Sequence, residues 1–306
     1  MSTAPSERPP TIDAPAAERW QRLPAAASPW LHEEIGRRMA ERLQWIRLAP
    51  TAWADWQPVN GGLGAHQRVA NQYPAARVHV VEPRSASTAR QALQPAWWSA
   101  ARWRGPGAVW GDVTDGSVQM VWANMLLHQG ADPLGLIARW HRALSTDGFL
   151  MFSCLGPDTL TELRAVYQAL GWGEAAHAFT DMHDWGDMLV QTGFAEPVMD
   201  MERLVLTYDS PEALLRELRG LGRNLHPARF PALRGRAWRA RLLEALAQRL
   251  RRDAEGRLAL TFEVIYGHAF RPAPRVRLDA QSAIGLDDMR ALLRQGRGPD
   301  RKSTRL

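Results

Sequence analysis

The stretch DGFLMFSCLGPDTLTELR, Asp147 to Arg164, decides the fold class of this 306-residue chain. Its apolar run Phe149–Ser153 predicts a buried strand, and Thr159–Leu170, beyond a Gly-Pro-Asp turn, predicts a helix. Upstream, Val118–Ala123 predicts a strand and Pro133–Leu144 a helix. Strands and helices therefore alternate, which indicates a parallel sheet with right-handed crossovers.

The same alternation extends in both directions along the chain. The pattern predicts a helix from Trp30 that ends before Pro50, a helix at Ala65–Gln72, and strands at Ala52–Trp56, Arg77–Val81, Val198–Tyr208 and Leu258–Ala269. Two further helices, Pro211–Leu221 and Ala237–Arg251, lie between the last two strands. This block is too long for a loop in a compact domain, so we interpret it as a lid or substrate-binding insertion.

These elements predict an α/β protein of four parts. We expect residues 1–28, which contain five prolines, to be mobile. A doubly wound, Rossmann-like domain is expected over 29–208 and 258–272, with the helical lid at 209–257. A C-terminal extension with a basic tail follows at 273–306.

Composition excludes several classes of protein. With 45% hydrophobic and 23% charged residues the chain is globular, and it lacks both a membrane-span pattern and a secretory signal, so we expect a cytoplasmic protein without a membrane partner. The single cysteine, Cys154, excludes an internal disulfide and a cysteine-built zinc site. The spacing of His128, His183 and Asp184 matches no standard ligand motif, so no metal is predicted.

The charge of +6 is almost entirely due to arginine, because Lys302 is the only lysine. Schiff-base chemistry and a phosphate-loop lysine are thereby excluded. Basic charge indicates an electrostatic partner without identifying it, and an acidic protein satisfies it as well as a nucleic acid does.

The stretch Asp147–Arg164 resembles the fifth strand and following loop of class I S-adenosylmethionine-dependent methyltransferases, in particular the malonyl-carrier-protein O-methyltransferases of biotin synthesis. The resemblance continues through TDMHDWGDMLVQTGFAEPVMDMERLVLTY, Thr180 to Tyr208, and LTFEVIYGHAF, Leu260 to Phe270. It implies a mostly parallel sheet whose last strand is antiparallel, S-adenosylmethionine as cofactor, and a malonyl-loaded acyl carrier protein as partner.

The resemblance also implies where the cofactor binds. Family members have an acidic residue and a G-x-G-x-G turn after the first strand and another acid after the second. Here Asp55 and Glu82 are the matching acids, while Gln57 and Val59 replace two of the turn glycines. We predict that three nearby glycines rebuild the turn one step later: Gly61, Gly62 and Gly64.

Four further positions come from the resemblance. Asp112 lies where family members place an acid near the adenine, and Asn124 ends the fourth strand facing the methyl donor. It belongs to no N-P-P-Y motif of the kind that base-modifying enzymes carry, so no nucleic-acid partner is expected. Trp30 and His32 lie where the family has a tyrosine near the cofactor.

The reaction itself explains the absence of a catalytic triad. The sulfonium methyl group is already activated and a carboxylate is already nucleophilic, so alignment and exclusion of water matter more than a general base. No catalytic residue is assigned. For holding the acceptor or its acidic carrier we select arginines, whose planar fork matches a carboxylate: Arg203, Arg216, Arg219 and Arg223.

Two alternatives remain open on the sequence alone. The altered glycine segment is compatible with a non-catalytic partner or regulator built on a methyltransferase fold, because fold does not guarantee function. The chain could equally methylate a different acidic small molecule through a changed lid.

Overall fold

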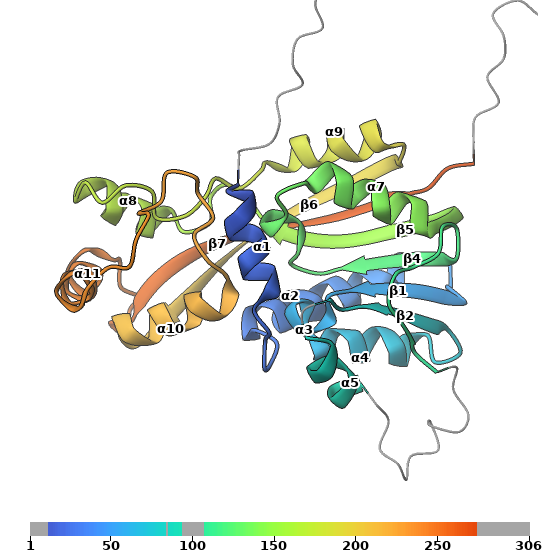
Figure 1. The fold of residues 1–306 in the computed structure, drawn as a ribbon, viewed down its shortest axis with the longest axis horizontal. Coiled ribbons are helices and arrows are strands. Elements are labelled where there is room, and N and C mark those ends of the chain that lie inside the picture. The colour runs from blue at the N-terminus through green and yellow to red at the C-terminus, as the bar shows by residue number, and fades with distance from the viewer. Residues whose placement is uncertain (1–11, 84, 94–106, 274–306) are drawn as a thin grey trace, which may run out of the picture. The chain divides into compact units, whose positions relative to one another are not determined.

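A computed structural model describes residues 12–83, 85–93 and 107–273 (Figure 1). Within them a seven-stranded sheet has the order β3-β2-β1-β4-β5-β7-β6. All neighbours pair in parallel except β7, which is antiparallel to both β5 and β6. The strands are β1 Ala52–Trp56, β2 Arg77–Val81, β3 Val109–Trp110, β4 Val118–Ala123, β5 Leu144–Leu155, β6 Ala195–Tyr208 and β7 Leu258–Phe270. The predicted fold class, including the antiparallel last strand, is confirmed.

Helices cover both faces of the sheet, as Figure 1 shows. On one face lie α2 (Trp30–Arg42), α4 (Leu63–Gln72) and α5 (Ala86–Leu93), and on the other α7 (Pro133–Ala143) and α9 (Met182–Thr192). Alternate residues of each strand point to opposite faces, so the core divides in two. Trp53 and Met120 pack with α2 and α4, whereas their neighbours Ala54 and Val121 pack with α7 and α9.

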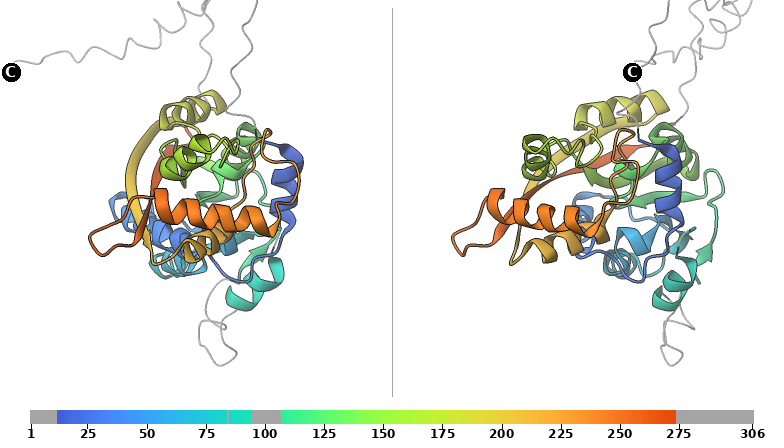
Figure 2. Two further views of the ribbon diagram at one scale, coloured as in Figure 1. Left: turned by 90° about the vertical axis from the view of Figure 1, so that its left-hand side faces the viewer. Right: turned by 60° about the vertical axis from the view of Figure 1, so that its left-hand side comes forward.

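The lid surrounds the far halves of the two longest strands, β6 and β7 (Figure 2). It consists of α10 (Pro211–Leu221) and α11 (Arg236–Arg249), which pack against each other, and α11 also packs against α8 (Thr161–Ala169). Leu214 of α10 and Leu246 of α11 are fully buried in the same core cluster as β7. Tertiary packing therefore fixes this insertion onto the sheet.

The segment expected to be mobile contains a helix, α1 (Ala14–Arg22), so that expectation is wrong for these residues. Its prolines misled the prediction because Pro15 lies in the first turn, where a missing N–H costs nothing. Asp13 caps the helix by accepting from Ala16 N at 3.0 Å, and Ala17 and Trp20 are buried. Nearly all of the predicted C-terminal extension, 273–306, lies outside the described residues.

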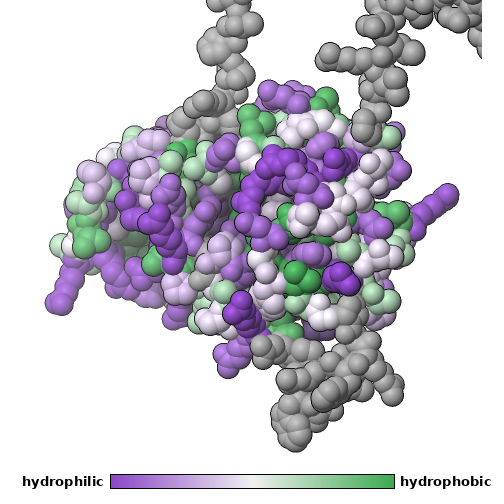
Figure 3. Space-filling view, turned by 45° about the vertical axis from the view of Figure 1, so that its right-hand side comes forward, coloured by the Kyte–Doolittle hydropathy of each residue, from purple (hydrophilic) through white to green (hydrophobic). Residues whose placement is uncertain are grey.

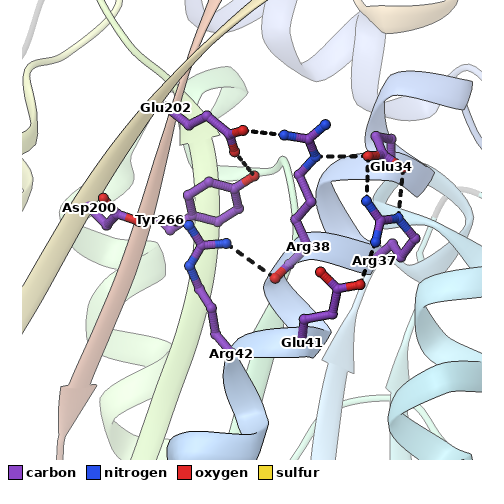
Figure 4. A network of polar contacts seen from close by, with 8 residues as sticks. All are labelled: Glu34, Arg37, Arg38, Glu41, Arg42, Asp200, Glu202 and Tyr266. Atoms are coloured by element: carbon purple, nitrogen blue, oxygen red, sulfur yellow. Dashed lines mark hydrogen bonds and ion pairs between the residues drawn. The ribbon is translucent and has the colours of Figure 1, made fainter.

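Helix α2 is pinned to the antiparallel edge of the sheet by charged side chains (Figure 4). Arg38 pairs with Glu202 of β6, and Arg42 pairs with Asp200 at 2.6 Å and lies 3.8 Å above the ring of Tyr266. Glu202 also accepts from the Tyr266 hydroxyl at 3.2 Å. The network therefore fixes the position of α2, whose opposite side reaches the strand ends.

The surface shown in Figure 3 is predominantly hydrophilic, with hydrophobic side chains in small groups. Within the described residues, no helix is both long and apolar enough to cross a bilayer.

Candidate active site

The carboxyl end of β1 leads into a compact turn that carries the altered glycine segment. Gln57 adopts a left-handed conformation with φ 57°, and Pro58–Gly61 form one helical turn, α3. Gly62 has φ 117°, a conformation that favours glycine, and α4 begins at Leu63. The segment therefore makes a tight strand-to-helix turn with Gly62 at its positive-φ position; that this turn replaces the family's glycine turn stays a prediction.

Gly61 and Gly64 have close neighbours, a backbone oxygen in the first case and a side-chain carboxylate in the second. A Cβ on Gly61 would lie 3.0 Å from the Asn124 carbonyl oxygen, and one on Gly64 would lie 2.8 Å from Glu33 Oε2. The Glu33 carboxylate accepts from Gly64 N at 3.0 Å and from Ala65 N at 3.1 Å. A side chain of α2 thus satisfies the free N–H groups at the start of α4, a role that the sequence analysis missed.

Asp55 is buried beneath the turn and does not line an open space at the ends of the strands. Its carboxylate is 2% exposed and lies 2.7 Å from His66 Nδ1 of α4. Burial raises the pKa of this carboxyl above its usual value. The contact joins β1 to the helix after the turn, so Asp55 holds the turn in place.

Glu82 is buried at the end of β2, where it links two loops. Its Oε2 accepts from Val59 N at 3.1 Å and its Oε1 from Ser85 N at 3.2 Å. Val59 belongs to the altered glycine segment, so the carboxylate meets the turn directly.

Asn124 lies at the centre of a buried hydrogen-bond network after β4. Its Nδ2 donates to the carbonyl oxygens of His32, at 2.7 Å, and Gly61. Its Oδ1 accepts from Ser153 Oγ at 2.5 Å, and this hydroxyl accepts from Met125 N at 3.0 Å. The ends of β1, β4 and β5 are thereby joined to α2 around one side chain.

Three cavities open among the described residues near these strand ends. The strand-end cavity has a volume of about 720 Å³ and is lined by residues that include Trp56, Gln57, Val81, Pro83, Asp112, Leu126 and Arg139. Gln57 Oε1 is buried there without a protein partner, and Asp112 is exposed, 3.0 Å from Arg139. The cavity brings residues that follow β1, β2, β3 and β4 around one space.

The second space, the histidine cavity, measures about 460 Å³, and its lining includes Leu127, His128, Phe179, Thr180 and Trp185. It shares Gly130, Ala131 and Asp132 with the strand-end cavity, so the two adjoin. The third, the arginine cavity, measures about 520 Å³ and is lined by Trp20, the segment 23–30, Arg216, Glu217, Arg219, Gly220 and Arg223. It shares no lining residue with the other two.

No family model matches the chain. Curated relatives do: a malonyl-[acyl-carrier protein] O-methyltransferase of Gallionella capsiferriformans is 41% identical over 266 residues, covering 84% of this chain and 90% of the relative. One of Laribacter hongkongensis is 42% identical over 261 residues, with 81% and 86% covered. The chain belongs to the malonyl-[acyl-carrier protein] O-methyltransferase family.

Solved structures agree with this family at the level of the fold. A candidate methyltransferase of Bacillus halodurans matches 78% of this chain and 100% of its own with a TM-score of 0.52 at 14% identity. The YcgJ protein of Bacillus subtilis matches 78% and 99% with a TM-score of 0.51 at 13% identity. The sheet order and antiparallel β7 are those of class I methyltransferases.

In this family member three of the four selected arginines lie together. Arg216 and Arg219 are on α10, and Arg223 lies just beyond it because the helix ends at Leu221. The Arg223 guanidinium is 4.6 Å from the centre of the Trp20 ring, which brings α1 into the same wall.

Arg203 lies elsewhere. It projects from β6 and pairs with Asp158, and its side chain is 57% exposed. It was selected with the other three as a group that could hold the acceptor, but it is separated from them. Because β6 is the edge strand, the charge remains in water at little cost.

Trp30 and His32 lie on different sides of α2. Trp30 is 60% exposed on the rim of the arginine cavity, whereas His32 is fully buried with its Nδ1 2.6 Å from the Asn60 carbonyl oxygen. Burial lowers the pKa of His32 to about 4. His183 is exposed beside Asp181, and no group of metal-ligating side chains converges within the described part of the chain.

Proposed function

We propose that this chain transfers the methyl group of S-adenosylmethionine to the free carboxylate of a malonyl group on acyl carrier protein, in the synthesis of the pimeloyl precursor of biotin. The observation that carries the proposal is the 41% identity to a protein of that name over 90% of its length. The strand-end cavity supplies the space in which the cofactor would bind.

The residues around this cavity fit the adenosyl half of the cofactor. Trp56, Val81 and Leu126 offer apolar walls, and the unpartnered Gln57 Oε1 and exposed Asp112 offer acceptors for an exocyclic amine. Glu82 lies between two lining residues, Val81 and Pro83. Glu82 Oε2 could accept from a ribose hydroxyl as well as from Val59 N, because a carboxylate oxygen accepts two hydrogen bonds, so one carboxylate would contact both the cofactor and the turn.

The methionyl half would meet the turn and Asn124. Asn124 Nδ2 donates to the Gly61 carbonyl oxygen and holds the two residues together. These two residues would position that half of the cofactor. The cofactor supplies an electrophilic methyl group when bound. The protein has to align the acceptor and exclude water, and α1 contributes to the exclusion because it lines the strand-end and histidine cavities.

The lid is suited to an acidic carrier protein. The lid, residues 209–257, contains twelve arginines and six acidic residues, a net charge of +6 that equals the charge of the whole chain. The positive charge of the protein is therefore concentrated on the lid, where it would steer an acidic partner toward the strand ends.

Mass spectrometry of malonyl-loaded carrier protein after incubation with enzyme and S-adenosylmethionine tests the proposal. Gain of one methyl group by the malonyl-loaded carrier, with none on acetyl-loaded carrier, is expected. Methylation of free malonate or another free acid, without dependence on the carrier, would favour a small-molecule methyltransferase. No methylation by a folded protein that binds no cofactor would favour a non-catalytic role.

A further inference from the structure

The place of the acceptor carboxylate is constrained by the cofactor. Methyl transfer requires the attacking oxygen and the methyl carbon to approach to roughly 3–3.5 Å. The acceptor must therefore bind in a space that adjoins the cofactor. The histidine cavity meets this condition through Gly130, Ala131 and Asp132, and the arginine cavity shares no wall with the strand-end cavity.

The hydrogen bonds around Gln129 determine which nitrogen of His128 carries the proton. Trp20 Nε1 can only donate, and it donates to Gln129 Oε1 at 2.7 Å. The amide nitrogen of Gln129 therefore points the other way, donating to the Leu221 carbonyl oxygen at 3.1 Å and to His128 Nε2 at 3.3 Å. His128 Nε2 is an acceptor, so the neutral imidazole has its proton on Nδ1.

This Nδ1–H group is buried and has no protein partner. An unpaired buried donor is costly, and such groups call for an explanation such as a ligand. The His128 carbonyl oxygen accepts from His177 Nε2 at 3.0 Å, which fixes the backbone that carries the ring. Burial, together with His32 and His177 nearby, lowers the pKa of His128 well below its usual value, so the ring is neutral at pH 7.

We propose that the histidine cavity is the subsite for the acceptor carboxylate and that His128 Nδ1–H donates the hydrogen bond that holds it. This inference rests on the proposed function and names the residue that function requires. Phe179, Leu127 and Trp185 supply the apolar walls. Asp132 also lines the cavity, and its Oδ1 is occupied in capping α7 through Gly135 N at 2.9 Å.

A neutral single donor suits this reaction better than a guanidinium. A bidentate arginine would occupy both carboxylate oxygens and hold the negative charge that must attack. One N–H leaves the second oxygen free to form the new O–CH₃ bond as the S–CH₃ bond breaks and its electron pair stays on sulfur. The carboxylate becomes a neutral ester and the sulfonium a neutral thioether, and no proton is transferred.

The test compares two substitutions of His128. His128→Leu removes the donor, whereas the amide nitrogen of His128→Asn lies near the position of Nδ1. We expect His128→Leu to lower kcat/KM for malonyl-loaded carrier by about 10- to 100-fold, the range for a hydrogen bond to a charged group. His128→Asn should recover most of this loss. Affinity for S-adenosylhomocysteine, measured by calorimetry, should be unchanged in both, as should kcat/KM for the exposed control His183→Leu.

A second measurement separates this inference from the proposed function. In protein with ¹⁵N-labelled histidine, the His128 Nδ1–H resonance, assigned with His128→Asn, should shift when malonyl-pantetheine is added to the complex with S-adenosylhomocysteine. If the wild-type protein methylates the carrier and a folded His128→Leu protein does so equally well, the proposed subsite is wrong and the proposed function stands. A shift without methylation would support the subsite and contradict the function. Protonation on Nε2 in place of Nδ1 would overturn the subsite whatever the activity.

Discussion

Trp20 Nε1 donates to Gln129 Oε1 at 2.7 Å, joining two residues that are 109 positions apart in the sequence. The bond attaches α1 to the loop after β4, and Asp13 attaches the start of the helix to the lid through an ion pair with Arg229 at 2.6 Å. The bond from Trp20 also orients the side-chain amide of Gln129, which determines the tautomer of His128. Helix α1 therefore belongs to the site and is not an accessory to it.

Trp20→Phe should keep an aromatic ring at this position while removing the Nε1–H donor and part of the indole. Gln129 Oε1 would be left buried without its partner, which should lower the free energy of unfolding by about 1–3 kcal/mol. The amide would also be free to rotate, so the Nδ1 preference of His128 should weaken. Urea unfolding and the ¹⁵N spectrum check both effects, and an unchanged spectrum would mean that Gln129 is held by its other contacts.

Two helical glycines should respond oppositely to alanine. A Cβ on Gly36 would overlap Ala65 Cβ and lie 2.8 Å from Asn124 Nδ2, whereas one on Gly220 meets nothing within 4 Å. Gly36→Ala should lower the free energy of unfolding by about 1–3 kcal/mol through overpacking, and Gly220→Ala should raise it by up to about 1 kcal/mol. Equal effects in urea unfolding would contradict the close approach of α2 to the turn.

Glu82 should be needed for the cofactor as well as for the turn. Glu82→Ala leaves Val59 N and Ser85 N without their acceptor, so both stability and S-adenosylhomocysteine affinity should fall, the latter by about tenfold or more. Glu82→Gln keeps one acceptor oxygen and should retain more stability than affinity. Calorimetric titration of the two folded variants is the measurement. Wild-type affinity in both would remove Glu82 from the cofactor site.

The arginines of α10 should act on carrier association. Arg216→Glu combined with Arg219→Glu should raise KM for malonyl-loaded carrier most strongly at low salt, because exposed charges are screened beyond about 10 Å at 0.1 M. Arg47→Glu combined with Arg68→Glu, two exposed arginines outside the lid, is the charge-matched control. If the control raises KM equally, net charge and not the lid surface governs association.

Stability should decrease below neutral pH. Burial lowers the pKa values of His32 and His177 to about 4, while unfolded histidines titrate near 6.5. Between these values the unfolded chain binds more protons, so each histidine should cost about 2 kcal/mol at pH 5 relative to pH 8. Urea unfolding of His177→Gln should show a shallower pH dependence than wild type or the exposed control His183→Gln. An identical dependence would exclude His177 as a contributor.

Much of the fold could be predicted because β1, β2, β4, β5 and β7 are rich in apolar residues and are separated by turns or helices. The two-residue strand β3 was missed because it is too short to show a period. Helix α1 was missed because its stability depends on Trp20 and Asp13 contacting residues far away in the sequence, which no local pattern reveals.

The residues of the candidate site could be predicted from the sequence only in part. Glu82 and the shifted glycines were selected from the family resemblance; the structure places them at the end of β2 and in the turn after β1, and their part in cofactor binding stays a prediction. The role of His128 could not be predicted, since it depends on which way a glutamine amide points. Arg203 was selected from the family resemblance and its arginine chemistry, and neither shows that its strand lies at the edge of the sheet, away from the other three arginines.

Calorimetric titration of the purified protein with S-adenosylmethionine tests the central claim most directly. The claim is that Gly61, Gly62 and Gly64 form a working turn although Gln57 and Val59 replace the family glycines. Saturable binding of one cofactor per chain, weakened in Glu82→Ala, is the predicted result. No heat and no thermal stabilisation, from protein shown to be folded, would contradict it.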